Sequence, residues 1–390
     1  MLANFLKPVD PEKLLHEPRS YARTWGAETA FPADIDSLEE SETHLALIGV
    51  PGSRQSAGRI VSDGSTDRIR RALYPLAAGH PNQRIADLGD VIPGETEADT
   101  RVAVREICGE LIDRGIVPIV IGKGQALTHP IYEAFEKRKN SINLVSVDTH
   151  IDLIDHPEVT ETSWIWHVLD REPSHLFNFT AVAYQSHFVP HELVDSLEKL
   201  HFEHLRLGRI RDDIRLVEPA VRDADIVSFD LNSVRASDSM AHPLAGPNGL
   251  FGEEACRIAR YAGISDKLGA FGVFGYDADL DRRGMAAALV AQMIWYFVDG
   301  FYNRKGDIPP RERGEFLRYT VAIGQEGESH EMTFLKSTRS GRWWMEVPFQ
   351  VSDEEEEHNA IFPCSYEDYE AALKQEVPDR WLRAMHRLNV

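Results

Sequence analysis

Short, almost uninterrupted apolar runs alternate along this chain with longer segments that have the spacing of amphipathic helices. We expect strands at eight of these runs: 44–50, 84–91, 116–122, 142–148, 180–185, 204–208, 224–231 and 268–276. The helical patterns between them lie at 97–114, 127–139, 190–200, 252–262 and 284–303. Strands that are apolar on both faces, with helices between them, are typical of a parallel sheet covered on both sides. The sequence therefore predicts an α/β core, either a closed barrel or an open doubly wound sheet.

The two ends of the chain differ from this core, which we expect to span residues 44–305. Residues 1–43 are rich in proline and acidic residues and are predicted to form an N-terminal extension over the surface. Residues 306–390 are predicted to add a β-hairpin and a final helix that pack on the core, because Trp343 and Trp344 need covering. The acidic run at 353–357 is expected to be a solvated loop.

Charge and cysteine content narrow the classes of function. The formal net charge of −21 argues against a nucleic-acid or anionic-membrane partner. The three cysteines are scattered and fit a reducing, cytoplasmic compartment rather than a disulfide framework or a thiolate metal site. We expect no signal peptide, and the longest apolar stretch, 286–298, is expected to be a buried core helix rather than a membrane span. Neither a GxGxxG nor a Walker motif is present, so no nucleotide fingerprint is found.

Acidic and amide residues cluster where three of the predicted strands end. Gln125 follows the expected strand 116–122. Asp148, His150 and Asp152 lie at the end of the strand 142–148, and Asp230 and Asn232 lie at the end of the strand 224–231. Alternate residues of an extended chain point to the same side, so these side chains can converge. Ligands of α/β folds sit beyond the carboxyl ends of the strands. Carboxylates with one imidazole suit Mn²⁺ or Mg²⁺; the alternative is a set of strand-end caps and ion pairs.

Three motifs carry a family resemblance. GKGQ (122–125), DTHID (148–152) and SFDLN (228–232) resemble, in order and rough spacing, the metal motifs GGxH, DAHxD and SFDxD of the ureohydrolases: arginase, agmatinase and formimidoylglutamase. The resemblance spans roughly residues 44–300, and the long ends look closest to a formimidoylglutamase-like branch. It implies a three-layer arginase-like α/β fold with an eight-stranded, mostly parallel sheet, in a homo-oligomer. It also implies hydrolysis of a linear amidine or guanidine by hydroxide bound to Mn²⁺.

The resemblance also assigns residues to roles. The implied metal positions are Gln125, Asp148, His150, Asp152, Asp230 and Asn232. Asp148 and Asp230 would bridge two Mn²⁺ ions. His167, from a Ser-x-x-x-His match, would relay protons, and Glu254 would hold the cationic end of the substrate. The alternatives are an ordinary hydrogen-bonded histidine at 167 and a first-turn acid at 254 that the helix dipole stabilises.

Two positions depart from the family motifs. Gln125 stands where the family has histidine, and Asn232 where it has aspartate. A neutral amide lacks the basicity of imidazole and the charge of a carboxylate, so we expect one tightly held Mn²⁺ ion at most, or none. In the alternative interpretation both amides hydrogen-bond the neighbouring carboxylates in place of a metal. Lys123 would then direct its ammonium group into the acid cluster.

Two functions are therefore open. The first is a formimidoylglutamase-like C–N hydrolase acting on a small cationic amidine or guanidine. The second is a catalytically degenerate ureohydrolase-fold protein that serves as an interaction or assembly component with a protein partner. The changes at Gln125 and Asn232 favour the second, whereas the retained acids and His150 favour the first.

Overall fold

The computed structural model describes residues 5–14, 23–38, 43–56, 59–139, 141–309, 315–324, 330–350 and 357–389. Its core sheet has the strand order β1-β6-β3-β7-β12-β11-β8-β9-β10, with β2 beside β6. The eight long strands are β3 (Leu45–Val50), β6 (Ile85–Val91), β7 (Val117–Gly122), β8 (Ile142–Val147), β9 (Leu176–Tyr184), β10 (Glu203–Arg206), β11 (Ile226–Asp230) and β12 (Ala270–Phe274). All eight are parallel, and the open order excludes a closed barrel.

The N-terminal extension adds two short strands to the predicted eight. β1 (Leu6–Lys7) pairs antiparallel with β6, and β2 (Thr29–Ala30) pairs parallel with it. Strands of two residues carry no readable periodicity, which is why the sequence predicted only a surface segment here. A separate hairpin, β4 (Ser53–Ser56) and β5 (Arg59–Ser62), follows β3.

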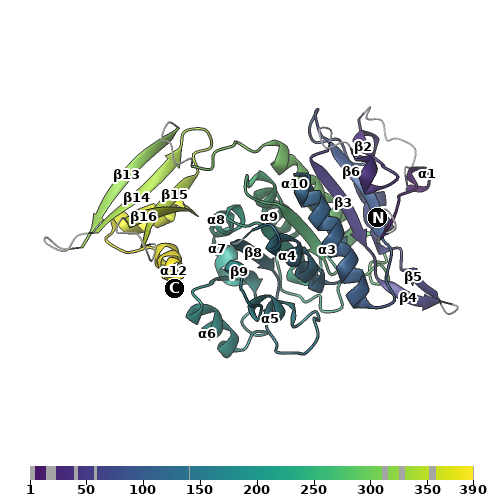
Figure 1. Cartoon of the computed structure of the whole chain (residues 1–390), viewed down its shortest axis with the longest axis horizontal. Helices are drawn as coiled ribbons and strands as arrows, with labels where there is room; N and C mark the ends of the chain where they lie inside the picture. Colours follow the sequence, from purple (N-terminus) through teal and green to yellow (C-terminus); the bar gives the residue numbers. More distant parts are fainter. Residues whose placement is uncertain are drawn as a thin grey trace.

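Helices cover both faces of the sheet, so the core has three layers (Figure 1). One face buries residues of α2 (Ser65–Leu73), α7 (Leu207–Asp212), α8 (Val217–Arg222), α9 (Gly252–Ile264) and α10 (Met285–Tyr302). The other face buries residues of α3 (Glu97–Asp113), α4 (Thr128–Glu136), α5 (Trp164–Leu169) and α6 (His191–Lys199). Strand β3 shows the alternation that makes this possible, because Leu45 and Leu47 face one layer while Ala46 and Ile48 face the other.

Helix α10 is long and apolar enough, by length and composition, to cross a membrane. In the structure it lies in the core beside α9, and most of its apolar residues are buried. The contact is close: a side chain on Gly263 of α9 would collide with the carbonyl oxygen of Phe297 on α10. The placement agrees with the core helix predicted from the sequence.

The C-terminal part contains more structure than the predicted hairpin and single helix. Four antiparallel strands, β13 (Phe316–Ile323), β14 (His330–Ser337), β15 (Trp343–Gln350) and β16 (Glu357–Cys364), form a second sheet. Two helices follow, α11 (Tyr366–Leu373) and α12 (Asp379–Leu388), separated at Pro378. Residues 353–356 of the acidic run lie outside the described residues, and Glu357 begins β16. Figure 1 shows this sheet at the end of the molecule opposite the N-terminal strands.

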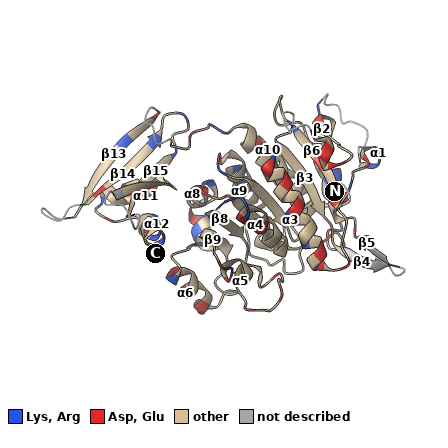
Figure 2. Ribbon diagram, in the orientation of Figure 1, with Lys and Arg blue, Asp and Glu red and all other residues tan. Residues whose placement is uncertain are grey.

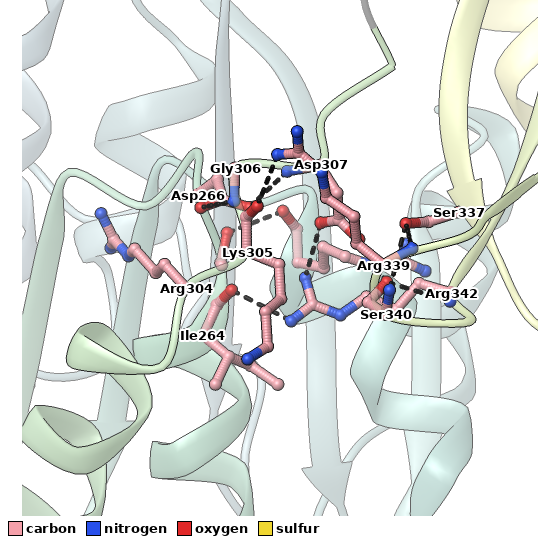
Figure 3. A network of polar contacts seen from close by, with 12 residues as sticks. Ile264, Asp266, Arg304, Lys305, Gly306, Asp307, Ser337, Arg339, Ser340 and Arg342 are labelled. Atoms are coloured by element: carbon pink, nitrogen blue, oxygen red, sulfur yellow. Dashed lines mark hydrogen bonds and ion pairs between the residues drawn. The ribbon is translucent and has the colours of Figure 1, made fainter. Parts of the chain in front are cut away.

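A polar joint ties the second sheet to the core (Figure 3). The carboxylate of Asp266 accepts hydrogen bonds from the backbone nitrogens of Gly306 (3.1 Å) and Asp307 (3.3 Å). Arg342, in the turn before β15, donates to the carbonyl of Ile264 (3.3 Å) and pairs with Asp307 (3.5 Å). These contacts hold the segment after α10 between the two parts.

An aromatic contact reinforces the joint. Arg222 of α8 is 5% exposed; its guanidinium lies 4.4 Å from the ring centroid of Trp344 and donates to the carbonyls of Trp343 and Cys364. Phe177 of β9 stacks on Phe362 of β16 at 6.0 Å. Core side chains therefore form part of the interface that the second sheet covers.

Candidate active site

The carboxyl ends of four adjacent strands bring the candidate residues together. The sheet order β7-β12-β11-β8 places β11 and β8 side by side, so the residues after both strands meet at one edge. Asp148, His150, Asp152, Asp230 and Asn232 all line one cavity of about 1100 Å³ at this edge. Gln125, only 1% exposed, lies beneath it. Acidic residues are spread over many elements of the chain, as the colouring of Figure 2 shows, so it is the burial of these acids at one edge that sets the site apart.

One backbone amide and one tryptophan side chain hold the two carboxylates of the segment after β8. The amide of His150 donates to Asp148 Oδ1 at 2.8 Å, which turns the chain directly after the strand. The indole nitrogen of Trp164, on α5, donates to Asp152 Oδ2 at 2.9 Å. The imidazole of His150 is less buried than the two carboxylates, with Nδ1 3.8 Å from Asp148 Oδ1.

The segment after β11 is arranged in a similar way and is tied to the first. The amide of Asn232 donates to Asp230 Oδ1 at 2.7 Å. The side-chain oxygen of Asn232 accepts from the amide of Thr149 at 3.1 Å, so it faces the backbone of the neighbouring segment. His242, which the sequence did not single out, places Nε2 3.5 Å from Asp230 Oδ1.

Gln125 holds the two carboxylates of the β8 segment through its side-chain amide. Its nitrogen lies 2.6 Å from Asp148 Oδ2 and 3.3 Å from Asp152 Oδ2, and its oxygen accepts from the hydroxyls of Ser146 and Ser228, each at 3.1 Å. The opposite orientation would let the nitrogen donate to the same hydroxyls but would place the amide oxygen against the carboxylates. We therefore assign the first orientation. It agrees with the alternative in which Gln125 hydrogen-bonds the acids.

Gly275, directly after β12, leaves room for Asp230. Its φ of +84° lies in the left-handed region, and a Cβ there would come within 2.6 Å of Asp230 Oδ1 and 2.7 Å of the His242 ring. A larger residue at this position would displace the side chains of Asp230 and His242.

Asp148, Asp152 and Asp230 form the acidic floor of the cavity, and their burial sets its electrostatics. Burial raises the pKa of Asp152 and of Asp230 well above the usual value, and the charge of Asp148 raises both further. Burial also raises the pKa of Asp148, although the hydrogen bond from the His150 amide opposes it. Burial lowers the pKa of His242 to about 4, so this imidazole is neutral at neutral pH. Three carboxyl groups thus lie together where burial and mutual repulsion disfavour their ionised forms, and the neutral imidazole beside them does not relieve this.

Glu161 is a second residue that the sequence reasoning missed. It lines the cavity and accepts a hydrogen bond from the amide of Ala126 at 3.0 Å, and burial raises its pKa. Glu161 and His242 both lie in loops that follow site strands. Searching the whole loop after each strand, rather than its first residues, would have found them.

Lys123 does not direct its ammonium group to the floor acids. Its Nζ pairs with Asp277 at 3.4 Å and with Asp63 at 3.8 Å. The two carboxylates belong to loops after β12 and β5, so this cation is held at the side of the cavity.

His167 and Glu254 are not among the residues that line the cavity. The His167 ring faces His129 of α4, with centroids 6.1 Å apart, and its Nε2 is buried without a partner in the described residues. Glu254 accepts from the amide of Phe251 at 2.7 Å and so caps the start of its own helix, α9. Their proposed roles as proton relay and substrate anchor remain predictions from the resemblance.

The arrangement does not fit a pair of divalent ions. Within the described ranges, no three His, Cys, Asp or Glu side chains are placed so that one ion could contact all of them. At the position of the missing histidine, an amide NH₂ group faces Asp148 and Asp152, and a nitrogen that carries two hydrogens cannot be a metal ligand. The oxygen of Asn232 is used by the Thr149 backbone.

Comparison with known proteins identifies the family. A family model described as the arginase family matches residues 43–299. Formimidoylglutamase of Salmonella heidelberg is 23% identical over 290 residues, covering 69% of this chain and 89% of the relative. In structure, the formiminoglutamase of Trypanosoma cruzi with Mn²⁺ aligns with a TM-score of 0.61 at 20% identity, covering 70% of this chain and 98% of the other.

Formimidoylglutamase of Bacillus subtilis aligns with a TM-score of 0.64 at 17% identity, covering 74% of this chain and 95% of the other. Similarity at these identities shows a shared fold. The match to the family model covers all eight parallel strands of the core sheet, including every strand that carries a candidate residue. This chain therefore belongs to the arginase family.

Proposed function

We propose that this protein binds a cationic amidine or guanidine at the acidic floor of its cavity, and that it has lost two-metal C–N hydrolysis. The observation that carries the proposal is the amide of Gln125, which donates to Asp148 and Asp152 where a metal-binding imidazole would stand. A hydrogen-bond donor in that place offsets the repulsion between the two carboxylates without an ion.

The charge of the cavity supports a cationic ligand. Its acidic lining residues are Glu97, Asp148, Asp152, Glu161, Glu192, Asp230 and Asp277, and its basic ones are Arg101 and Lys123. Amidinium and guanidinium groups are planar cations with several N–H donors, which match carboxylate oxygens in pairs. Held at the floor, such a group would contact buried carboxylates in a partly desolvated site.

Restoring the family residues tests the loss of hydrolysis. The double variant Gln125→His with Asn232→Asp returns one imidazole and one carboxylate, so Mn²⁺ content after purification should rise above that of the parent. Gln83→His is the matched control, because Gln83 is also buried (7% exposed) but lies outside the site. Release of formamide from formimidoylglutamate, and of urea from arginine and agmatine, is measured for all three proteins with Mn²⁺.

We expect the parent protein to hold one Mn²⁺ ion at most and to hydrolyse none of the three substrates. A parent rate in the range typical of enzymes, about 1–10³ s⁻¹, would overturn the proposal without any variant. Two stoichiometric Mn²⁺ ions in the dialysed parent would show that Gln125 and Asn232 are competent ligands.

A C–N hydrolase of the formimidoylglutamase kind is the second candidate. Asp148, His150, Asp152 and Asp230 are all retained and line one cavity, and relatives named formimidoylglutamase match most of the chain. In that case bound Mn²⁺ would supply hydroxide near neutral pH. The substrate assay above distinguishes the two candidates. An inactive parent could also serve as an assembly component with a protein partner.

A further inference from the structure

The cavity has an apolar mouth that the binding of a cationic head group does not explain. The apolar mouth consists of Ile154, Phe188 and Leu244, which are 53%, 45% and 60% exposed. They come from the loops after β8, β9 and β11, so three separate segments add exposed, large apolar side chains to the lining of one cavity. Exposed apolar residues scattered singly are ordinary, but a set gathered at a cavity indicates a ligand groove.

The mouth and the acidic floor are continuous. The ring of Phe188 lies 5.1 Å from the ring of His150, centroid to centroid, and His150 follows Asp148 on the floor. The volume of about 1100 Å³ slightly exceeds the range of roughly 300–1,000 Å³ that takes drug-sized ligands. An unsubstituted guanidinium or a short amidine would leave most of this space to water.

The basic residues of the lining are already engaged. Lys123 pairs with Asp63 and Asp277. Arg101 lies 3.8 Å from Glu97 and 3.5 Å from the carbonyl of Val159. To receive the two carboxylates of a glutamate-derived tail, each cation would first have to give up a carboxylate partner. Such a tail would instead meet acidic and apolar walls, at a cost in desolvation.

We propose that the ligand carries an apolar tail of several carbons on its amidinium or guanidinium head, and not the dicarboxylate tail of formimidoylglutamate. The head would meet Asp148, Asp152 and Asp230, and the tail would pack on the apolar mouth. The position of the head rests on the proposed function above. The nature of the tail rests on the mouth and on the engaged cations.

A series of alkylguanidines tests the tail directly. Ethyl-, butyl-, hexyl- and octylguanidine are titrated into the full chain by calorimetry, with formimidoylglutamate and 1-octanol as comparison ligands. Each added methylene that packs on the mouth should tighten binding about threefold, which gives roughly 10²–10³-fold from ethyl to octyl. Formimidoylglutamate should bind more weakly than butylguanidine, and 1-octanol, which lacks the cation, more weakly than octylguanidine.

Variants of two residues of the apolar mouth test whether the alkyl tail packs there. Leu244→Ser and Phe188→Ala should each weaken octylguanidine about tenfold and leave ethylguanidine almost unchanged. Leu373→Ser is the matched control, because this leucine of α11 is also exposed (52%) but lies in the C-terminal part. It should change neither affinity.

The outcomes separate the two proposals. If ethylguanidine binds but chain length has no effect, or if formimidoylglutamate binds best, the apolar tail is refuted and the acidic floor stands. If 1-octanol binds as well as octylguanidine, the cationic head is refuted and the apolar groove stands. No binding by any probe overturns both. If Leu244→Ser or Phe188→Ala dissociates an oligomer in sedimentation experiments, the mouth is a subunit interface and the tail proposal is wrong.

Discussion

Replacing Gln125 by glutamate exchanges an NH₂ donor for an acceptor at almost constant volume. The amide nitrogen lies 2.6 Å from Asp148 Oδ2 and 3.3 Å from Asp152 Oδ2, so an ionised glutamate would place an oxygen against two carboxylates. Burial and these neighbours would raise the pKa of the new carboxyl group in the folded state, because both disfavour its charged form. The Gln125→Glu variant should therefore fold with its introduced carboxyl group protonated and donating to Asp148.

The cost of that proton depends on pH and can be worked out. Glutamate in the unfolded chain has a pKa of about 4.3, so below that pH the variant and the parent should differ little in charge. Above it, the unfolded state ionises while the folded state does not, and the loss of stability grows by about 1.36 kcal/mol per pH unit. If the folded pKa exceeds 7, the loss at pH 7 reaches about 3.7 kcal/mol.

Urea unfolding of the parent, Gln125→Glu and Gln125→Met between about pH 4.5 and 7.5 measures this difference. Gln125→Met removes the same amide without adding an ionisable group, so its cost relative to the parent should rise with pH less steeply than that of Gln125→Glu. Mn²⁺ should stabilise the glutamate variant more than the parent, because the donor has become a carboxylate oxygen. A glutamate variant that follows the parent at every pH would show that the amide does not face the two acids.

Three further changes test other parts of the structure. Arg70, buried on α2, pairs with the buried Asp87 at 2.9 Å and with the partly buried Asp90 at 2.6 Å. Arg70→Met should destabilise the protein by about 3–5 kcal/mol in urea unfolding, because it leaves both carboxylates without a cation. Gly275→Ala should cost about 1–3 kcal/mol and weaken guanidine binding by displacing Asp230. Gly284→Ala is its control, since that site has positive φ but open space. Arg222→Met should cost about 1–3 kcal/mol and speed release of the C-terminal sheet in limited proteolysis, because two carbonyls lose their donor.

The core strands could be predicted because most of them are buried on both faces, so the same short apolar pattern recurs along the chain. A strand such as β7 is buried on both faces and reads as an apolar run, and its neighbours follow the same rule. The convergence of Asp148 and Asp230 also followed from the sequence, since parallel strands end at one edge. The C-terminal part was harder to predict. Residues 352–356 are all polar, so nothing in them announces β16. Pro378 separates two helices where the sequence predicted one.

Contacts between distant segments could not be read from the sequence. Lys123 follows β7, and only the fold decides whether its flexible side chain meets the floor acids or Asp63 and Asp277. Glu161 reaches the cavity through an irregular loop with no periodic pattern. The choice of Gln125 between metal ligand and hydrogen-bond donor likewise depends on Ser146 and Ser228, which orient its amide from below.

The joint between the two sheets bears on whether the core could exist without the C-terminal sheet. Arg222 of α8 is buried under Trp344, and Phe177 of β9 stacks on Phe362, although both Arg222 and Phe177 lie in the part that matches the family. A deletion of the C-terminal sheet would expose this cation and this aromatic ring to solvent. We expect residues 43–299, expressed alone, to be poorly soluble, so the boundaries of a family need not be those of an independently stable protein.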